Sequence, residues 1–302
     1  MNLPPHFTKT VTSTFTGGAE WLTHLPNLLA ECERRWDLTV QPTNFTLSYN
    51  YVAPATLADG TEIVLKVGVP NRELRTEIEA LRLYAGRGCV RLLDADPEQG
   101  VLLLARLHPG EMLTTLTDDD EATRIAALAM QTLWWQLPAE HNFPSVADWG
   151  DGLAELREAF GGGTGPFEGR LVDTAVSLFT DLLASSDEPV LLHGDLHHYN
   201  ILSSSDGWQV IDPKGVVGEP AYEVGALLRN PIATIFDEPD LKGITARRLD
   251  ILAETLSIDR ERMRQWSLAQ AVLSVWWSYE DGGDSADWEL TMRLANVLLE
   301  VS

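Results

Sequence analysis

The 302-residue sequence predicts an α+β protein in two parts, because strand-like and helix-like patterns occupy different stretches. Up to about residue 105, most apolar residues alternate with polar ones or form short runs, as they do in strands. From Thr117 onward the apolar residues recur at intervals of three and four, which is typical of helices. Pro109-Gly110 lies between the two stretches and marks a boundary. We therefore expect a smaller part over residues 1–107 and a larger, mostly helical part over residues 108–302.

The first part is expected to begin with a helix and to continue mainly in strands. Apolar residues recur at helical spacing between residues 17 and 36. Residues 45–51 alternate between apolar and polar, which predicts a strand, and Pro54 is expected to end it. The further expected elements are a strand over residues 62–69 after the turn at Asp59-Gly60, a helix over residues 72–84, and strands over residues 90–94 and 101–105.

The second part reads as a series of helices. An acidic run at residues 117–121 suits the positive N-terminal end of the first one. This first helix is expected to reach residue 136. Further helices are expected over residues 149–160 and 169–185, followed by a tail helix with an apolar stripe over residues 268–279. The glycines at 161–163 follow a helical pattern and not a strand, so they predict a flexible turn and no phosphate-binding loop.

Composition limits the classes of partner. The chain has 22 basic and 45 acidic side chains, a formal net charge of −23. Such a surface repels nucleic-acid phosphates, so we expect no nucleic-acid partner. It would attract a polycationic small molecule; the alternative is that the charge serves only solubility. Cys32 and Cys89 have neither metal-ligand nor disulfide spacing. No secretory signal and no apolar run near the ~20 residues of a membrane span is present, so we expect a soluble, cytoplasmic protein.

The densest chemical signal lies between Leu191 and Gly215. Two apolar runs bracket a polar loop that carries Asp195 and, five positions later, Asn200; Asp212 follows at the end of the next apolar run. Phosphoryl transfer from a magnesium nucleotide needs such a trio, with one Asp to orient and deprotonate an acceptor hydroxyl and an Asn and a second Asp to hold the metal ion. The alternative is a hairpin in which these residues only cap turns.

Residues 193–200 match the motif H-G-D-x-x-x-x-N, and in this motif the chain resembles the aminoglycoside phosphotransferases. The resemblance implies a bilobal, protein-kinase-like fold that transfers a phosphoryl group from ATP with Mg²⁺. It makes Asp195 the catalytic base and Asn200 and Asp212 the metal ligands. The sequences D-P-K-G at 212–215 and G-E-P-A-Y-E-V-G at 218–225 narrow the resemblance to the branch of streptomycin 6-phosphotransferases and hydroxyurea-resistance kinases.

The same resemblance implies a nucleotide site in the first part. Lys66 lies in the apolar strand 63–67, where an ammonium group needs an anion; the alternative is an edge lysine that reaches solvent. Glu77, in a pattern like E-x-x-A-L, is the expected partner. The glycine-rich loop of protein kinases is missing. Hinge backbone groups would contact adenine, and we nominate Ala105, Arg106 and Leu107.

The acceptor is expected to be a small molecule with a hydroxyl group, and a cationic one would suit the acidic chain. Residues 276–284 combine aromatic rings with carboxylates, and the family holds its cationic antibiotic with acidic residues of this C-terminal region. Glu280 and Asp281 are therefore candidate substrate contacts; the alternative is a capped helix end. An aminoglycoside such as streptomycin is the first expected substrate, and a metabolic sugar or amino-alcohol kinase is the rival. A pseudokinase-like nucleotide-binding module is less favoured, because a pure binder needs no base at Asp195.

Three neighbouring features carry smaller predictions. His193 is expected to support the loop by hydrogen bonding. His197 and His198 are adjacent, and no third ligand has suitable spacing, so we expect no zinc site. Glu223 could tie its helix to the catalytic loop. The alternative is that its carboxylate only interacts with the positive N-terminal end of that helix.

Overall fold

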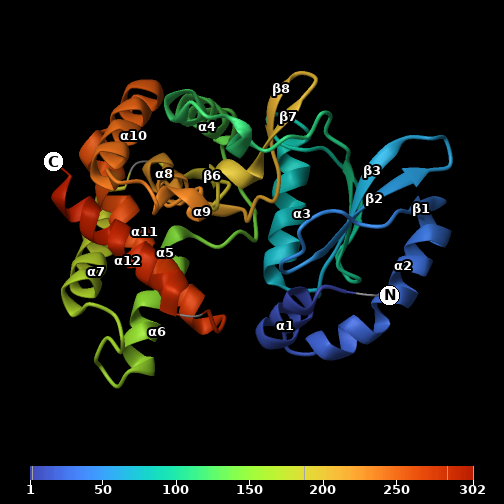
Figure 1. The fold of residues 1–302 in the computed structure, drawn as a ribbon, viewed down its shortest axis with the longest axis horizontal. Coiled ribbons are helices and arrows are strands. Elements are labelled where there is room, and N and C mark those ends of the chain that lie inside the picture. The colour runs from blue at the N-terminus through green and yellow to red at the C-terminus, as the bar shows by residue number, and fades with distance from the viewer. Residues whose placement is uncertain (2, 187, 284, 302) are drawn as a thin grey trace. The chain divides into compact units, whose positions relative to one another are not determined.

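The computed structural model describes residues 1, 3–186, 188–283 and 285–301. The chain divides into two compact units, Met1–Gly110 and Glu111–Ser302. No helix among these residues is long and apolar enough to cross a bilayer. Figure 1 labels the elements of both units.

The first unit is built on a five-stranded sheet of antiparallel pairs in the order β1-β2-β3-β5-β4. Its strands are Leu38–Val40 (β1), Tyr51–Leu57 (β2), Glu62–Val67 (β3), Leu92–Asp96 (β4) and Val101–Ala105 (β5), and its helices are Pro5–Thr14 (α1), Gly18–Trp36 (α2) and Arg72–Tyr84 (α3). The expected helices at 17–36 and 72–84 are thus confirmed as α2 and α3, whereas α1 was not predicted.

Strand β3 has two differently occupied faces. Ile63, Leu65 and Val67 belong to a buried core that includes apolar residues of α1 and α2. Because alternate residues of a strand point to opposite faces, Lys66 projects to the other side of the sheet. Its ammonium group meets Glu77 of α3 on that side.

The expected strand over residues 45–51 is wrong. Strand β2 begins where that strand was expected to end and runs straight through Pro54. Proline lacks an N–H and is tolerated only where the ladder needs none. The pairing with β1 ends at Val40 opposite Ala55, and the Pro54 carbonyl still accepts a hydrogen bond from Gln41 N at 2.9 Å. Pro54 has no N–H to donate, but it lies beyond the end of β1, so no hydrogen bond between β1 and β2 is lost.

The second unit is mainly helical. Its helices are Asp119–Leu133 (α4), Val146–Gly150 (α5), Gly152–Ala159 (α6), Gly169–Ala184 (α7), Val224–Leu228 (α8), Ile232–Ile235 (α9), Leu241–Leu256 (α10), Arg260–Glu280 (α11) and Ser285–Glu300 (α12), with short 3₁₀ turns Leu113–Thr115 (η1), His198–Asn200 (η2) and Pro220–Glu223 (η3). The strands Val190–Leu192 (β6) and Val216–Gly218 (β9) pair antiparallel, as do Ile201–Ser204 (β7) and Gly207–Val210 (β8).

Helix α11 is the centre of this unit. It packs against α7, α8, α10 and α12, and Figure 1 shows α10 and α12 beside it. Its residues Trp266, Leu268 and Val272 are completely buried. A helix covered on several sides is apolar on several sides, so the predicted stripe at 268–279 was only part of its buried surface. At the start of α4, Asp118 accepts hydrogen bonds from Asp120 N and Glu121 N, which confirms the acidic cap.

Candidate active site

The polar loop between Leu192 and Ile201 is held at both ends by strands. Strand β6 enters it and pairs with β9, and β7 leaves it and forms a hairpin with β8. Asp212 follows two residues after β8, as the sequence pattern predicted. The Ile211 N–H donates to the Asn200 carbonyl at 2.9 Å, which joins the end of the loop to the segment before Asp212.

Glu223 braces the start of the loop. Its carboxylate accepts hydrogen bonds from the backbone N–H of His193 at 2.7 Å and of Gly194 at 2.9 Å. The tie between η3 and the catalytic loop is therefore confirmed. Glu223 is 1% exposed, and burial raises its pKa to about 7 even though the two backbone donors favour the charged form.

The His193 ring fixes two further segments. Its Nε2 lies 2.8 Å from the Ile211 carbonyl, and its Nδ1 accepts a hydrogen bond from Asp195 N at 3.1 Å. Since the carbonyl can only accept, Nε2 carries the proton and Nδ1 does not. Burial lowers the pKa of His193 to about 4, so the ring is neutral at pH 7. His193 supports the loop by hydrogen bonding, as predicted.

Gly194 is required by its surroundings. Its φ is +87°, a conformation that side chains disfavour. A Cβ there would lie 2.6 Å from the Trp149 ring and 2.9 Å from Val216. Trp149 of α5 thus packs directly on the loop backbone next to Asp195.

Asp195 is surrounded by cationic and hydrogen-bonding groups. Arg229 donates from Nη2 to its Oδ1 at 3.2 Å, and His197 Nε2 lies 3.5 Å from its Oδ2. Burial alone would raise the pKa of Asp195, but His197, Arg229 and Lys214 together lower it well below the usual range. The carboxylate is therefore ionised at neutral pH, the state in which it can accept a proton.

Asn200 and Asp212 provide oxygen ligands of the kind that Mg²⁺ prefers. Asn200 donates from Nδ2 to the Asp195 carbonyl at 2.9 Å, so its Oδ1 is the opposite end of the amide, and no described residue donates to that oxygen. Asp212 has φ +59°, a conformation that residues other than glycine adopt only uncommonly. One carboxylate and one amide oxygen fit a magnesium ion that is completed by phosphates and water. Accordingly, the described part of the chain contains no cluster of three His, Cys, Asp or Glu side chains that could hold a metal alone.

In the first unit, Lys66 and Glu77 form a buried ion pair. The Nζ–Oε1 distance is 2.7 Å, and the two residues are 3% and 6% exposed. This contact shows that Glu77 meets the strand lysine. Such a pair requires close geometry, because each charge gives up hydration.

The predicted hinge residues lie at the end of β5. Ala105 is its last residue, and its N–H donates to the Arg91 carbonyl at 2.9 Å, so this amide is already used. Arg106 extends over the Phe45 ring, with its guanidinium carbon 4.9 Å from the ring centroid. Arg106 also lines a cavity of about 380 Å³ within the first unit. Leu107 is the next residue after Arg106. Its carbonyl oxygen lies so close to position 110 that a Cβ there would clash, so this position requires glycine.

Glu280 and Asp281 lie at the C-terminal end of α11. Asp281 is the capping residue, and its N–H donates to the Trp277 carbonyl at 3.0 Å. Burial raises the pKa of Glu280, and the neighbouring carboxylates Glu155 and Asp281 raise it further. Trp277 packs edge-on against Trp149 with a ring-centroid distance of 5.4 Å. One aromatic contact therefore links this helix end to the ring that covers the catalytic loop.

Two residues near Asp195 were missed by sequence reasoning. Arg229 follows α8 and also donates to Gln270 Oε1 of α11 at 2.8 Å. His198 is buried in η2, and no described residue bonds either of its ring nitrogens. Arg229 lies 34 positions from Asp195, and its surroundings in the sequence carry no motif. His198 was considered only as a zinc ligand.

Solved structures with a similar fold show that the chain has a protein-kinase-like fold. The choline kinase LicA of Streptococcus pneumoniae matches with a TM-score of 0.64 and 16% identity, over 92% of this chain and 99% of that one. An aminoglycoside phosphotransferase solved with ADP and hygromycin B matches with a TM-score of 0.63 and 13% identity, over 90% and 98% of the two chains. The predicted fold class is therefore confirmed.

Sequence relatives identify the family. Residues 35–282 match the aminoglycoside/hydroxyurea antibiotic resistance kinase model, and the chain belongs to this family. Streptomycin 6-kinase of Streptomyces glaucescens is 32% identical over 272 residues, which cover 89% of this chain and 88% of the relative. Hydroxyurea phosphotransferase of Kitasatospora aureofaciens is 34% identical over 285 residues, covering 93% and 81%. The chain is thus a kinase, and the family resemblance drawn from the motifs is confirmed.

Proposed function

We propose that this kinase transfers the γ-phosphoryl group of ATP to a hydroxyl group of streptomycin or a closely similar aminoglycoside. The observation that supports it most is the ionised Asp195, held by Arg229 on a loop whose Asn200 amide is tied to the same residue. The net charge of −23 favours a cationic acceptor over neutral hydroxyurea, because long-range attraction raises the local concentration of a polycation.

In the proposed reaction, Asp195 accepts the proton of the acceptor hydroxyl. A bond forms between that oxygen and the γ-phosphorus, the bond from the γ-phosphorus to the bridging oxygen breaks, and ADP leaves. Arg229 and His197 hold the Asp195 carboxylate in one orientation. Correct orientation matters, because a base that is displaced by about 1 Å can lose a hundredfold in rate.

Each unit carries residues with a proposed role in nucleotide binding. Asn200 and Asp212 would bind Mg²⁺, which when bound neutralises phosphate charge. Lys66, kept in place by Glu77, would bind the phosphates, and backbone groups of Ala105, Arg106 and Leu107 would bind adenine. Cys32 and Cys89 are buried and form no disulfide, which suits a reducing compartment, so we propose that the reaction takes place in the cytoplasm.

The carboxylates at the end of α11 keep a proposed role in binding the antibiotic. Glu280 and Asp281 lie within one turn of Trp277, whose ring packs on Trp149. A guanidinium group binds well where aromatic faces and carboxylates are combined. These two residues would therefore contact a cationic part of the acceptor.

The test follows ADP release with ATP and Mg²⁺ over streptomycin, other aminoglycosides, hydroxyurea, choline and simple sugars, with the phosphorylated product identified by mass. We expect turnover with streptomycin. Asp195→Asn should lower kcat by at least about a hundredfold and leave ADP affinity unchanged. Asp206→Asn, the same change at an exposed hairpin turn of this unit, is the control and should retain full activity.

Other results would redirect the assignment. Turnover of choline or a sugar but of no aminoglycoside would make the chain a metabolic kinase. Tight ATP binding without turnover of any acceptor would refute the proposed activity and favour a binding module.

A further inference from the structure

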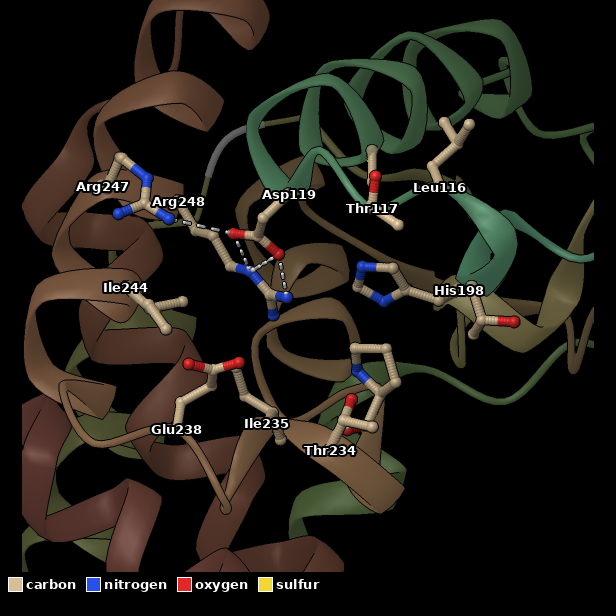
Figure 2. Close-up of a pocket in the computed structure, with 13 residues that line it drawn as sticks. Leu116, Thr117, Asp119, His198, Thr234, Ile235, Glu238, Ile244, Arg247 and Arg248 are labelled. Atoms are coloured by element: carbon tan, nitrogen blue, oxygen red, sulfur yellow. Dashed lines mark hydrogen bonds and ion pairs between the residues drawn. The ribbon is translucent and has the colours of Figure 1, made fainter.

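A cavity of about 260 Å³ lies within the second unit, beside the catalytic loop (Figure 2). It is enclosed by the start of α4, by η2, and by α9 and α10 with the segment that connects them. The titratable side chains that line it are Asp119, His198, Glu238, Arg247 and Arg248.

The two arginines of the cavity are already neutralised. Arg248 is 2% exposed; its Nε lies 3.1 Å from both Asp119 oxygens, and its Nη1 donates to the Asn230 carbonyl at 2.6 Å. Arg247 donates to Asp120 at 2.6 Å and lies 3.5 Å from Asp119. Because these guanidinium groups are bound by carboxylates and carbonyls, the cavity is not built to attract an anion such as phosphate.

His198 contributes hydrogen-bonding capacity that the protein itself does not use. The residue is 2% exposed, and across the described chain neither Nδ1 nor Nε2 has a hydrogen-bond partner. Figure 2 shows its ring projecting toward the Asp119–Arg248 pair. Leaving buried polar atoms without partners costs free energy, so such atoms in a cavity point to a bound molecule.

Glu238 provides an available negative charge at the same cavity. It lies in the exposed segment between α9 and α10. None of the residues that the structure describes forms an ion pair or a hydrogen bond with its carboxylate. Once the Asp119–Arg248 and Asp120–Arg247 pairs cancel, Glu238 is the charge that remains, and it would attract a cation.

Two lining residues are close along the chain to the proposed catalytic base and to its arginine partner. His198 follows Asp195 by three positions in the same loop. Pro231, another lining residue, follows Arg229 by two positions, and Arg229 donates to Asp195. A molecule in the cavity would therefore contact the loop that carries the proposed base.

Building on the proposed function, we propose that this cavity binds one ring of the acceptor, a hydroxylated ring with an amine or guanidine substituent. His198 hydrogen-bonds a ring hydroxyl and Glu238 pairs with the cationic substituent. The volume suits one ring, since pockets for whole drug-sized ligands are about 300–1,000 Å³. His198 and Glu238 thereby become residues that determine which acceptor is bound.

The test uses streptomycin as the probe, in calorimetric binding without nucleotide and in steady-state kinetics. His198→Phe keeps a flat ring and removes both nitrogens, and His198→Asn restores a polar group. His198→Phe should weaken streptomycin binding and raise its KM about tenfold, since one hydrogen bond is worth about that factor. The KM for ATP should not change, and His198→Asn should recover part of the affinity.

Stability provides a readout that separates ligand binding from support of the fold. Replacing a buried polar group that lacks partners by an apolar ring should leave the melting temperature unchanged or raise it. A merely structural histidine would lower it. Glu238→Gln should weaken streptomycin binding by a similar factor, most strongly at low salt. Asp237→Asn, an exposed neighbour that does not line the cavity, is the matched control and should bind normally.

The outcomes separate this inference from the proposed function. If the wild-type protein phosphorylates streptomycin while His198→Phe and Glu238→Gln keep its affinity and KM within twofold, the cavity assignment is overturned and the activity stands. If streptomycin binds, the two variants weaken it and no turnover occurs, the cavity assignment stands and the activity fails. Absence of streptomycin binding to the wild-type protein would overturn the cavity assignment.

Discussion

Arg229 offers the sharpest test of how the catalytic loop works. Its guanidinium bridges Asp195 Oδ1 at 3.2 Å and Gln270 Oε1 at 2.8 Å, and its side chain is only 12% exposed. Arg229→Met removes the charge and the donors while keeping a long apolar side chain. The hydrogen bond to Asp195 joins two charged groups, and such bonds are worth about 1.5–3 kcal/mol. We therefore expect kcat to fall roughly 10- to 100-fold.

The pH dependence shows how Arg229 acts. In Arg229→Met, His197 and Lys214 still lower the pKa of Asp195, so the carboxylate stays ionised at neutral pH. The loss in kcat should therefore remain when the pH is raised, because the carboxylate has lost its orientation and not its charge. Measurement of kcat and KM for streptomycin between pH 6 and pH 9 checks this expectation.

Two further variants serve as controls. Arg229→Lys keeps a cation and should recover part of kcat, and Gln270→Leu removes only the second anchor of the guanidinium and should have a smaller effect. ADP affinity and the melting temperature should change little in each. A kcat of Arg229→Met within twofold of wild type would refute the role assigned to Arg229, and a loss that disappears at high pH would mean that Arg229 sets ionisation only.

Two other predictions follow from buried charges. Lys66→Met should lower the free energy of unfolding in urea by about 3–5 kcal/mol, because it removes the cation 2.7 Å from buried Glu77. The double variant Lys66→Met/Glu77→Leu should recover most of that loss. A Lys66→Met variant as stable as wild type would contradict the role of the ion pair. The pKa of Glu223 is raised from its ordinary 4.5 to about 7, so its contribution to stability is present below pH 4.5 and is lost as the pH rises through 7. The stability of wild type relative to Glu223→Gln should therefore drop by on the order of 3 kcal/mol over that interval and level off above it, and a difference that does not vary with pH would show that Glu223 does not titrate there.

The sequence was most informative where chemistry depends on short spacing. Asp195 and Asn200 are five positions apart in one loop, so their relation could be predicted before any fold was known. Glu77 could be chosen because the helix after β3 offers few glutamates in the family pattern, and the 2.7 Å contact with Lys66 agrees with that choice. Local helix signals were also reliable, as the acidic start of α4 shows.

What could not be predicted depends on contacts between distant segments. Arg229 meets Asp195 only because α8 and α11 pack together and Gln270 anchors the guanidinium. The burial of His198 depends on α9 and α10, two helices for which no prediction was made. The expected strand at residues 45–51 was wrong for the same reason. Alternation and a proline are local signals, whereas the partner strand decides whether Pro54 is tolerated.

His193 joins two segments of the proposed site, the loop that carries Asp195 and the segment that carries Asp212. Its backbone N–H binds Glu223, its ring bonds the Asp195 N–H and the Ile211 carbonyl, and its own carbonyl accepts from Lys214 N at 2.8 Å and Gly215 N at 3.2 Å. The segment that carries Asp212 is therefore attached to His193 on both sides of that aspartate. Because one buried residue positions the proposed base and a proposed metal ligand together, a shift of His193 would displace both. The uncommon φ of +59° at Asp212 is consistent with this coupling, since a residue in a sparsely populated conformation persists only where its surroundings hold it firmly.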